Sequence, residues 1–195
     1  MTLRLLAITG RPGVGKTTLV LEISQRARSL GCRVGGIVTP EVRAPSGYRW
    51  GFKVRDLITG QEHVLASVDA GGPRIGKYRL DPKADDFITS TIRRALTESD
   101  LLIIDEVGPM ELSLTGFRNL ITAVLSSPPL PIALTFHYRL RTSNPGIYEL
   151  VTRGRVVELT EFNRSSVWAS IEGLTRWLVD EACGDKGGKG ATLHT

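Results

Sequence analysis

The sequence predicts an α/β fold of three layers (α/β/α), in which helices cover both faces of a mainly parallel β-sheet. Short apolar runs of strand length alternate along the chain with longer segments whose apolar residues recur at helical spacing. The runs are apolar at almost every position, as is typical of strands buried on both faces of a parallel sheet. Residues 41–80 break this alternation, and they predict a β-rich insertion.

The first elements establish the pattern. A strand is expected over Leu3–Thr9, an apolar run with one charge near its start. A helix is expected over Thr17–Leu30, because apolar residues three or four positions apart share one face and Gly31 stands where helices commonly end. A second strand is expected over Arg33–Thr39.

The segment 41–80 contains short strand-like runs with turn residues between them. The runs are Arg49–Leu57, Glu62–Ala66 and Ile75–Leu80, and none of them has a helical period. We therefore expect a small β-hairpin or meander inserted after the second strand.

The alternation resumes after residue 80. The expected helices are Asp81–Thr97, Leu114–Leu125, Asn144–Val151 and Asn163–Ala182. The expected strands are Leu101–Ile104, Pro131–Phe136 and Arg155–Leu159. Because no linker divides the chain, we expect residues 1–183 to form one domain and the Gly- and Lys-rich residues 184–195 to form a flexible tail.

Composition limits the class of protein. The 195 residues are 41% hydrophobic and 23% charged, which is typical of a globular protein and not of a disordered one. The net charge of +5 comes from basic residues spread along the chain, so nucleic acid is a possible partner but not the favoured one. No apolar stretch reaches the ~18 residues of a membrane-spanning helix, and the first apolar run lacks the cleavage site of a signal peptide. We expect no membrane partner, a cytoplasmic location, and a monomer or weak oligomer.

The two cysteines, Cys32 and Cys183, form no CxxC pair and have no histidine nearby at the spacing of a metal site. We therefore expect two incidental thiols in a reduced cytosol, and neither a disulfide nor a zinc site.

A phosphate-binding loop follows the first expected strand. Eight consecutive residues match GxxxxGK[ST] at every fixed position, and an amphipathic helix follows, as this motif requires. They are Gly10, Arg11, Pro12, Gly13, Val14, Gly15, Lys16 and Thr17. Glycines let main-chain N–H groups converge on phosphate oxygens, and the helix adds its positive end. The motif makes the predicted fold that of a P-loop NTPase.

Three side chains of this motif have predicted roles. Lys16 reaches the β- and γ-phosphates and is a predicted catalytic residue. The hydroxyl of Thr17 is a predicted ligand of Mg²⁺, the expected cofactor. Thr18, the next residue, is expected to help hold the α-phosphate.

An acidic pair follows the short apolar strand expected over Leu101–Ile104. The residues are Leu101, Leu102, Ile103, Ile104, Asp105, Glu106, Val107 and Gly108. In a P-loop fold the strand beside the first one ends in an aspartate that holds Mg²⁺, and Asp105 fits this role. Glu106 is a predicted general base that orients and polarises a water aimed at the γ-phosphate. The alternative is a solvated strand end, where acids are common.

Several segments together resemble the thermostable nucleoside-triphosphatase family, whose animal members are called cancer-related nucleoside-triphosphatases. They are Gly10–Thr18, Gly35–Arg43, Gly51-Phe52, Gly76-Lys77-Tyr78, Leu101–Leu112 and Glu161-Phe162-Asn163-Arg164. The resemblance implies Mg²⁺-dependent hydrolysis of ATP, GTP, CTP and UTP to diphosphates with little base selectivity. It also implies nucleotide contacts over Gly10–Thr17 and Leu101–Gly108. The segment 135–141 departs from the family pattern, so the resemblance names no catalytic arginine.

Further polar residues follow expected strands, at the sheet edge where such folds bind ligands. Glu41 and Arg43 can contact phosphate, Mg²⁺ or the attacking water, or can form an ordinary ion pair. Arg139, Arg141 or Arg164 can stabilise charge on the γ-phosphate, or can belong to a solvated basic surface.

Three aromatic residues, Trp50, Phe52 and Tyr78, lie in or beside the insertion. An aromatic ring can stack on a base without reading its identity, but such residues more often form the core of a small meander, which is the interpretation that we favour.

Three functions compete. The leading hypothesis is a nucleoside-triphosphate phosphohydrolase. The second is a small-molecule or nucleotide kinase, which usually has an arginine-rich lid. No compact lid is evident, although Arg139–Arg141 could serve as one, and Glu106 favours water as the acceptor. The third is a nucleic-acid-stimulated ATPase or a nucleotide switch, although the Asn-Lys-x-Asp sequence of a guanine-specific switch is absent.

Overall fold

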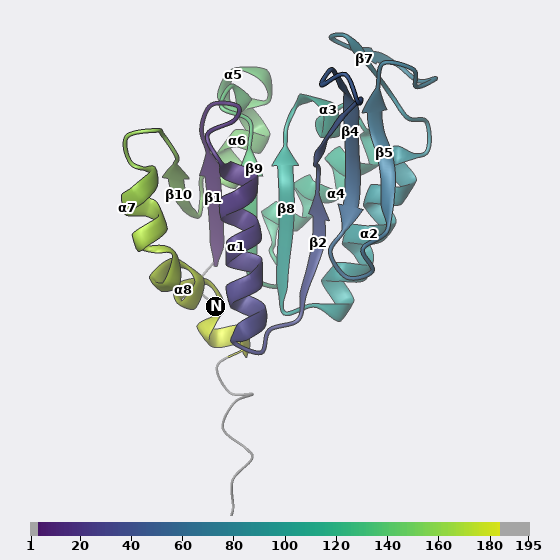
Figure 1. Cartoon of the computed structure of the whole chain (residues 1–195). Coiled ribbons are helices and arrows are strands. Elements are labelled where there is room, and N and C mark those ends of the chain that lie inside the picture. The colour runs from purple at the N-terminus through teal and green to yellow at the C-terminus, as the bar shows by residue number, and fades with distance from the viewer. Residues whose placement is uncertain (1–3, 184–195) are drawn as a thin grey trace, which may run out of the picture.

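The computed structural model describes residues 4–183, which form a ten-stranded sheet with helices on both faces (Figure 1). The strands are β1 (Leu5–Thr9), β2 (Val34–Val38), β3 (Glu41–Arg43), β4 (Arg49–Asp56), β5 (Glu62–Ser67), β6 (Arg74–Ile75), β7 (Tyr78–Leu80), β8 (Leu101–Val107), β9 (Ile132–Phe136) and β10 (Arg155–Glu158). The helices are α1 (Lys16–Ser29), α2 (Ala84–Glu98), α3 (Pro109–Leu112), α4 (Thr115–Ser126), α5 (Leu140–Ser143), α6 (Pro145–Val151), α7 (Arg164–Ala169) and α8 (Ile171–Cys183). Within residues 4–183, no helix has the length and apolarity that crossing a membrane requires.

The parallel part of the sheet has the strand order β10-β1-β9-β8-β2. Alternate residues of the inner strands β1, β9, β8 and β2 face opposite cores, as the pleat requires, whereas β10 is largely exposed. In β1, Leu5 and Ala7 join the core that contains residues of α2 and α4, whereas Leu6 and Ile8 join the core formed with α1 and α8. These two cores explain why the strand is apolar at successive positions, and they confirm the predicted three layers.

The position of β8 corrects one expectation. The strand that carries Asp105 was expected beside β1, but β9 lies between β1 and β8 and is parallel to both. The expected strand also ended at Ile104, whereas β8 runs to Val107 because Val107 pairs with Phe136 beyond a local irregularity of register. The carboxyl end of β9 therefore lies between the end of β1 and the acidic pair.

The insertion after β2 is a continuation of the main sheet. Its strand β4 pairs antiparallel with β2, and β5, β7 and β6 follow in antiparallel order, with β3 paired to β4. Tyr78 is buried and meets Phe52 edge to face, with ring centroids 5.3 Å apart. Both rings belong to the core that α2 covers, as the sequence analysis favoured.

The helix expected over Asn163–Ala182 is divided at Ser170 into α7 and α8. The Ser170 hydroxyl donates a hydrogen bond to Val167 O at 2.9 Å, and the Ser170 N–H is shared between Ser166 O and Val167 O. Side-chain bonding of this kind competes with the helical pattern, which explains the break.

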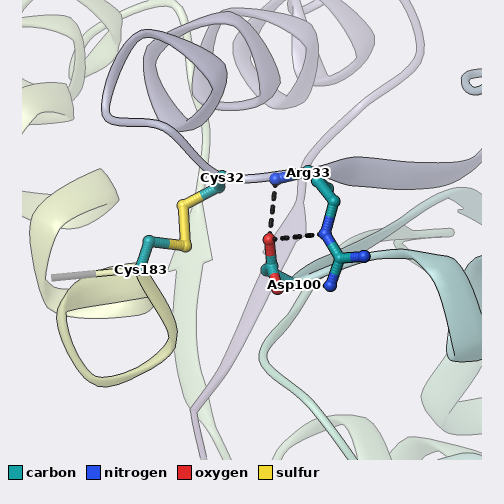
Figure 2. Close-up of a disulfide and its surroundings, with 4 residues drawn as sticks. All are labelled: Cys32, Arg33, Asp100 and Cys183. Carbon is teal, nitrogen blue, oxygen red and sulfur yellow. Dashed lines mark hydrogen bonds and ion pairs between the residues drawn. A yellow bond between two sulfur atoms is a disulfide. The ribbon is translucent and has the colours of Figure 1, made fainter. Parts of the chain in front are cut away.

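A disulfide joins Cys32 to Cys183 (Figure 2). The expectation of two incidental thiols was wrong. The two cysteines are 151 positions apart, but α8 packs beside α1, and the two Cα atoms are 5.4 Å from each other. An ion pair between Arg26 on α1 and Glu172 on α8, at 3.0 Å, crosses the same helix interface.

Arg33, the residue after Cys32, is fixed by contacts with the carboxylate of Asp100. The main-chain N–H of Arg33 donates to Asp100 at 2.9 Å, and its guanidinium pairs with the same carboxylate at 2.9 Å (Figure 2). These contacts fix the start of β2 against the start of β8, so the disulfide anchors α8 to a well-supported part of the fold.

We expect removal of the disulfide to lower stability without changing the fold. The cross-link constrains a very long loop in the unfolded chain, so a Cys32→Ser/Cys183→Ser variant should lose about 2–4 kcal/mol of unfolding free energy. Urea denaturation of parent and variant, each with and without a dithiol reductant, measures this. The reductant should destabilise the parent and leave the double variant unaffected. Equal midpoints for oxidised and reduced parent would contradict the structural role of the bond.

Candidate functional site

The loop between β1 and α1 has a backbone that glycine alone adopts readily. Gly10 and Gly15 have φ values of 147° and 107°, in the region that side chains with a Cβ rarely adopt. A Cβ at Gly10 would also lie 2.3 Å from the carbonyl oxygen of Leu159. The loop leads directly into α1 at Lys16, whose first-turn N–H groups lack partners within the helix. The result is a concave main-chain site suited to an anion.

Lys16 lies at this loop and is largely buried. Its Nζ donates to the carbonyl oxygen of Gly10 at 3.1 Å and lies 3.6 Å from Oε2 of Glu106. The ammonium group therefore bridges the loop and the acidic end of β8.

Asp105 is the centre of the hydrogen-bonding network, and its side chain is 1% exposed. The Thr17 hydroxyl lies 3.0 and 3.2 Å from its two carboxylate oxygens, and the Thr135 hydroxyl donates to Oδ1 at 2.5 Å. The Thr39 hydroxyl donates to the main-chain oxygen of Asp105 at 2.8 Å. Burial raises the pKa of the Asp105 carboxyl, while the hydrogen bonds from Thr135 and Thr17 oppose that rise.

Thr135 and Thr39 were missed as site residues in the sequence. Thr135 lies on β9, beside the strand that carries Asp105, and Thr39 directly follows β2, the neighbour on the other side. The available signal in the sequence was a hydroxyl at or next to the carboxyl end of a buried strand. This signal identifies site residues only when the strand order is known, because the order places the ends of β9 and β2 beside β8.

Two glutamates lie on either side of Gly108. A Cβ at Gly108 would lie 2.9 Å from Oε1 of Glu106 and 3.1 Å from Oε2 of Glu111. Burial raises the pKa of Glu106; the Asp105 charge adds to the rise, and Lys16 opposes it. Burial raises the pKa of Glu111, on α3, to about 8, and the charge of Glu106 contributes. Glu111 is therefore mostly protonated at neutral pH, and sequence reasoning assigned it no role.

The secondary candidates Glu41 and Arg43 form an ion pair with each other at 2.5 Å. Arg49 also pairs with Glu41, and the Arg43 guanidinium donates to the carbonyl oxygen of Gly47 at 2.9 Å. Their charged groups are thus engaged within the β3–β4 hairpin, which agrees with the ordinary ion pair considered above.

Three arginines were candidates for contacts with phosphate. Arg139, Arg141 and Arg164 are exposed, and none forms an ion pair with a carboxylate in residues 4–183. The Arg139 guanidinium lies over the ring of Tyr138, 5.2 Å from its centroid. Arg164 is the first residue of α7. Among residues 4–183, no hydrogen bond or ion pair joins these three side chains to Lys16 or Asp105.

His137 follows β9 at the same edge of the sheet. The main-chain N–H of His137 donates to Val107 O at 3.1 Å, and the ring Nδ1 accepts the main-chain N–H of Arg139 at 3.2 Å. Burial lowers the pKa of His137, and the charges of Lys16 and Arg139 lower it further. The imidazole is therefore neutral near pH 7.

The chemistry of the donors fits Mg²⁺ together with a phosphate chain. A hydroxyl and a buried carboxylate offer hard oxygen ligands, which Mg²⁺ prefers. Within residues 4–183, no group of three or more His, Cys, Asp or Glu side chains can hold a metal by itself. In proteins Mg²⁺ is usually held by one or two carboxylates, with substrate phosphate and water as the other ligands.

A glycine-rich loop between a buried strand and a helix, with a buried aspartate hydrogen-bonded to the threonine after the loop lysine, defines the fold of a P-loop NTPase. A family model described as NTPase matches residues 5–172. The chain belongs to this family.

Curated relatives and solved structures agree with that assignment. The chain is 47% identical over 136 residues to "Nucleoside-triphosphatase THEP1" of Methanothermobacter thermautotrophicus, which covers 69% of this chain and 78% of the relative. It is 44% identical over 151 residues to the protein of the same name from Thermofilum pendens, covering 76% and 81%. The crystal structure of THEP1 from Aquifex aeolicus superimposes with a TM-score of 0.73 at 31% identity, covering 87% of this chain and 98% of that one. The solution structure of a human cancer-related nucleoside triphosphatase gives 0.69 at 28% identity, covering 95% and 100%.

Glu111 should make stability depend on pH in the nucleotide-free protein. Its pKa is about 8 in the folded state against an ordinary value of 4.5, so the folded protein binds more protons than the unfolded chain between these values. The contribution of Glu111 is full below pH 4.5 and is lost as pH rises through 8. A Glu111→Gln variant has no carboxyl to ionise at this position and lacks this loss. From pH 5 to pH 8.5 the unfolding free energy of the parent should therefore fall by at least about 1 kcal/mol more than that of the variant, since one pKa unit corresponds to about 1.4 kcal/mol.

Urea denaturation at several pH values, with a chelator present, measures the difference. The matched control is Glu149→Gln, which changes an exposed glutamate and should follow the parent curve. Parallel curves for the parent and Glu111→Gln would show that the buried carboxyl does not titrate in this range.

Proposed function

We propose that this protein is a nucleoside-triphosphate phosphohydrolase, which converts nucleoside triphosphates to diphosphates and phosphate with Mg²⁺ and little selectivity for the base. The observation that carries the proposal is the meeting of four groups at the ends of β1, β8 and α1. They are Lys16, Thr17, Asp105 and Glu106. The names of the relatives support the same activity.

Binding of the triphosphate depends on the loop and Lys16. The main-chain N–H groups of residues 10, 11 and 13–17 surround the phosphate chain, since Pro12 has no N–H to donate. Thr18 lies near the α-phosphate, and the α1 N-terminus adds positive potential. Lys16 exchanges its contacts with Gly10 O and Glu106 for oxygens of the β- and γ-phosphates. This exchange aligns the terminal phosphate with the end of β8.

Thr17 and Asp105 would hold Mg²⁺ beside the β- and γ-phosphates. When bound, the ion supplies neutralisation of the phosphate charge and favours an in-line geometry. Asp105 can serve without moving far, because Thr17 and Thr135 already fix its carboxylate. The burial that raises its pKa makes a cation a favourable neighbour.

Glu106 accepts a proton from the attacking water. Its raised pKa brings it nearer to neutrality, where a carboxylate is a more effective base. Departure of Lys16 toward the phosphates removes the positive charge that opposes protonation of Glu106. Protonated Glu111 leaves Glu106 as the ionised member of the pair flanking Gly108.

The low base selectivity follows from the same residues. The groups named so far are suited to phosphate, metal and water, which all nucleoside triphosphates share. The cytoplasm holds both nucleoside triphosphates and Mg²⁺, so we propose that location.

Replacing the general base should separate binding from turnover. Glu106→Gln keeps the size and removes the proton acceptor, so kcat should fall at least tenfold, and by up to about 10⁴-fold, while Kd for Mg²⁺–ATP stays near the parent value. Single-turnover phosphate release and titration calorimetry measure the two quantities. Glu98→Gln, an exposed change at the end of α2, is the control and should behave as the parent. A Glu106→Gln protein with parent turnover would refute the assignment.

The reaction class is tested by phosphate release from ATP, GTP, CTP and UTP, each with and without Mg²⁺. We expect kcat/KM values within about tenfold of one another, because the groups named contact only phosphate, metal and water. We expect no release without the metal, because the ion neutralises charge on the phosphates in the transition state. Release that requires a second acceptor molecule would indicate a kinase. Strong stimulation by added DNA or RNA would indicate a nucleic-acid-stimulated ATPase.

A further inference from the structure

The orientation of a nucleotide on the phosphate loop follows from the strand order. Asp105, Glu106 and Thr135 lie on β8 and β9, to one side of β1, while β10 lies on the other side. The γ-phosphate faces Glu106 in the proposed function, on which this inference rests. The sugar and base must then extend in the other direction, toward β10 and the segment that follows it.

The segment after β10 is in direct contact with the phosphate loop. The N–H of Leu159 donates to Thr9 O at 2.8 Å, and its carbonyl oxygen closes the space beside Gly10. The Leu159 side chain approaches Gly15, where a Cβ would lie 3.9 Å from Cδ2. In Figure 1 the β10–α7 connection rises at the same edge of the sheet as the β1–α1 loop. This connection is therefore a side wall of the nucleotide site.

The connection is held in one conformation by its own hydrogen bonds. Asn163 Oδ1 accepts the N–H of Thr160 at 2.8 Å, and Thr160 Oγ1 accepts the N–H of Asn163 at 3.1 Å. Asn163 Nδ2 also donates to Glu158 O at 2.8 Å. These bonds close a turn whose two central residues are Glu161 and Phe162.

Phe162 is fully exposed on this turn, with an exposed fraction of 100%. The other exposed large hydrophobic residues in the described chain are Tyr48, Ile58, Tyr138 and Val156, which are 39–49% exposed. Phe162 joins neither hydrophobic core. A phenylalanine whose ring is exposed to water, on a closed turn beside an anion site, is unfavourable in water and is preorganised for a flat apolar ligand.

We propose that Phe162 is the base-stacking residue of this site, with its ring against the face of the nucleobase of a bound nucleoside triphosphate. Every base has a π-face, so stacking adds affinity without reading identity. The contact extends the nucleotide site beyond the phosphates to an apolar surface on the β10–α7 turn. It also differs from the aromatic candidates Phe52 and Tyr78, which are engaged in the core of the insertion beyond β2.

The test is a Phe162→Ala variant assayed with all four triphosphates. Stacking acts equally on bound substrate and transition state, so KM should rise about tenfold for each nucleotide while kcat stays unchanged. Phe162→Trp keeps an aromatic face and should keep the parent KM. Because the ring is fully exposed, Phe162→Ala should unfold at the parent temperature.

Two controls separate stacking from general damage. Mg²⁺-complexed tripolyphosphate has no base, so calorimetry should give the same Kd for the parent and Phe162→Ala. Tyr48→Ala removes an aromatic ring that is 49% exposed between β3 and β4, and it should leave KM unchanged.

The proposal is overturned if Phe162→Ala binds nucleotides as the parent does, or if it loses tripolyphosphate affinity by the same factor. A change in oligomeric state with parent KM would also overturn it, because the ring would then be a contact between chains. Calorimetry with a non-hydrolysable ATP analogue tests the stacking independently of the proposed hydrolysis. A parent protein that releases no phosphate would refute the hydrolysis. An affinity for the analogue that is about tenfold lower in Phe162→Ala than in the parent would still support the stacking.

Discussion

The buried carboxylate of Asp105 is the constraint on which the rest of the site depends. A carboxylate that is withdrawn from water must be hydrogen-bonded or paired, and here the hydroxyls of Thr17 and Thr135 supply those bonds. The two donors come from the start of α1 and from β9, so the bonds form only when the phosphate loop, β9 and β8 are in register. The same arrangement places the Lys16 ammonium group 3.6 Å from the Glu106 carboxylate.

Features set by neighbouring residues were predictable from the sequence. The phosphate loop depends on glycines that permit positive φ angles, and the strands of the parallel sheet are recognisable in the sequence as continuous apolar runs. The insertion was visible because turn residues interrupt residues 41–80. Features set by distant contacts were not predictable. The place of β9 between β1 and β8 has no local signal, and without it Thr135 is simply a threonine near the end of an apolar strand.

Glu111 and the disulfide show the same limit. The carboxyl of Glu111 is unusual only because folding buries it near Glu106 on the far side of Gly108, which spacing along the chain does not reveal. Cys32 and Cys183 looked unrelated because 151 positions separate them, and only the packing of α8 beside α1 brings them together. In each case a residue acquires its chemistry from a partner that tertiary structure supplies.

The bond between Cys32 and Cys183 has a mechanical consequence. It closes the main chain between those residues into a covalent ring that includes every strand of the sheet except β1. A stretching force applied to the chain after residue 183 is therefore transmitted through the disulfide to the segment between α1 and β2. The disulfide keeps this force from separating α8 from α1, starting at Cys183. Cys32 follows the C-terminal end of α1, and the phosphate loop lies at the N-terminal end of the same helix. A force transmitted through the disulfide therefore acts at the end of α1 that is remote from the catalytic groups.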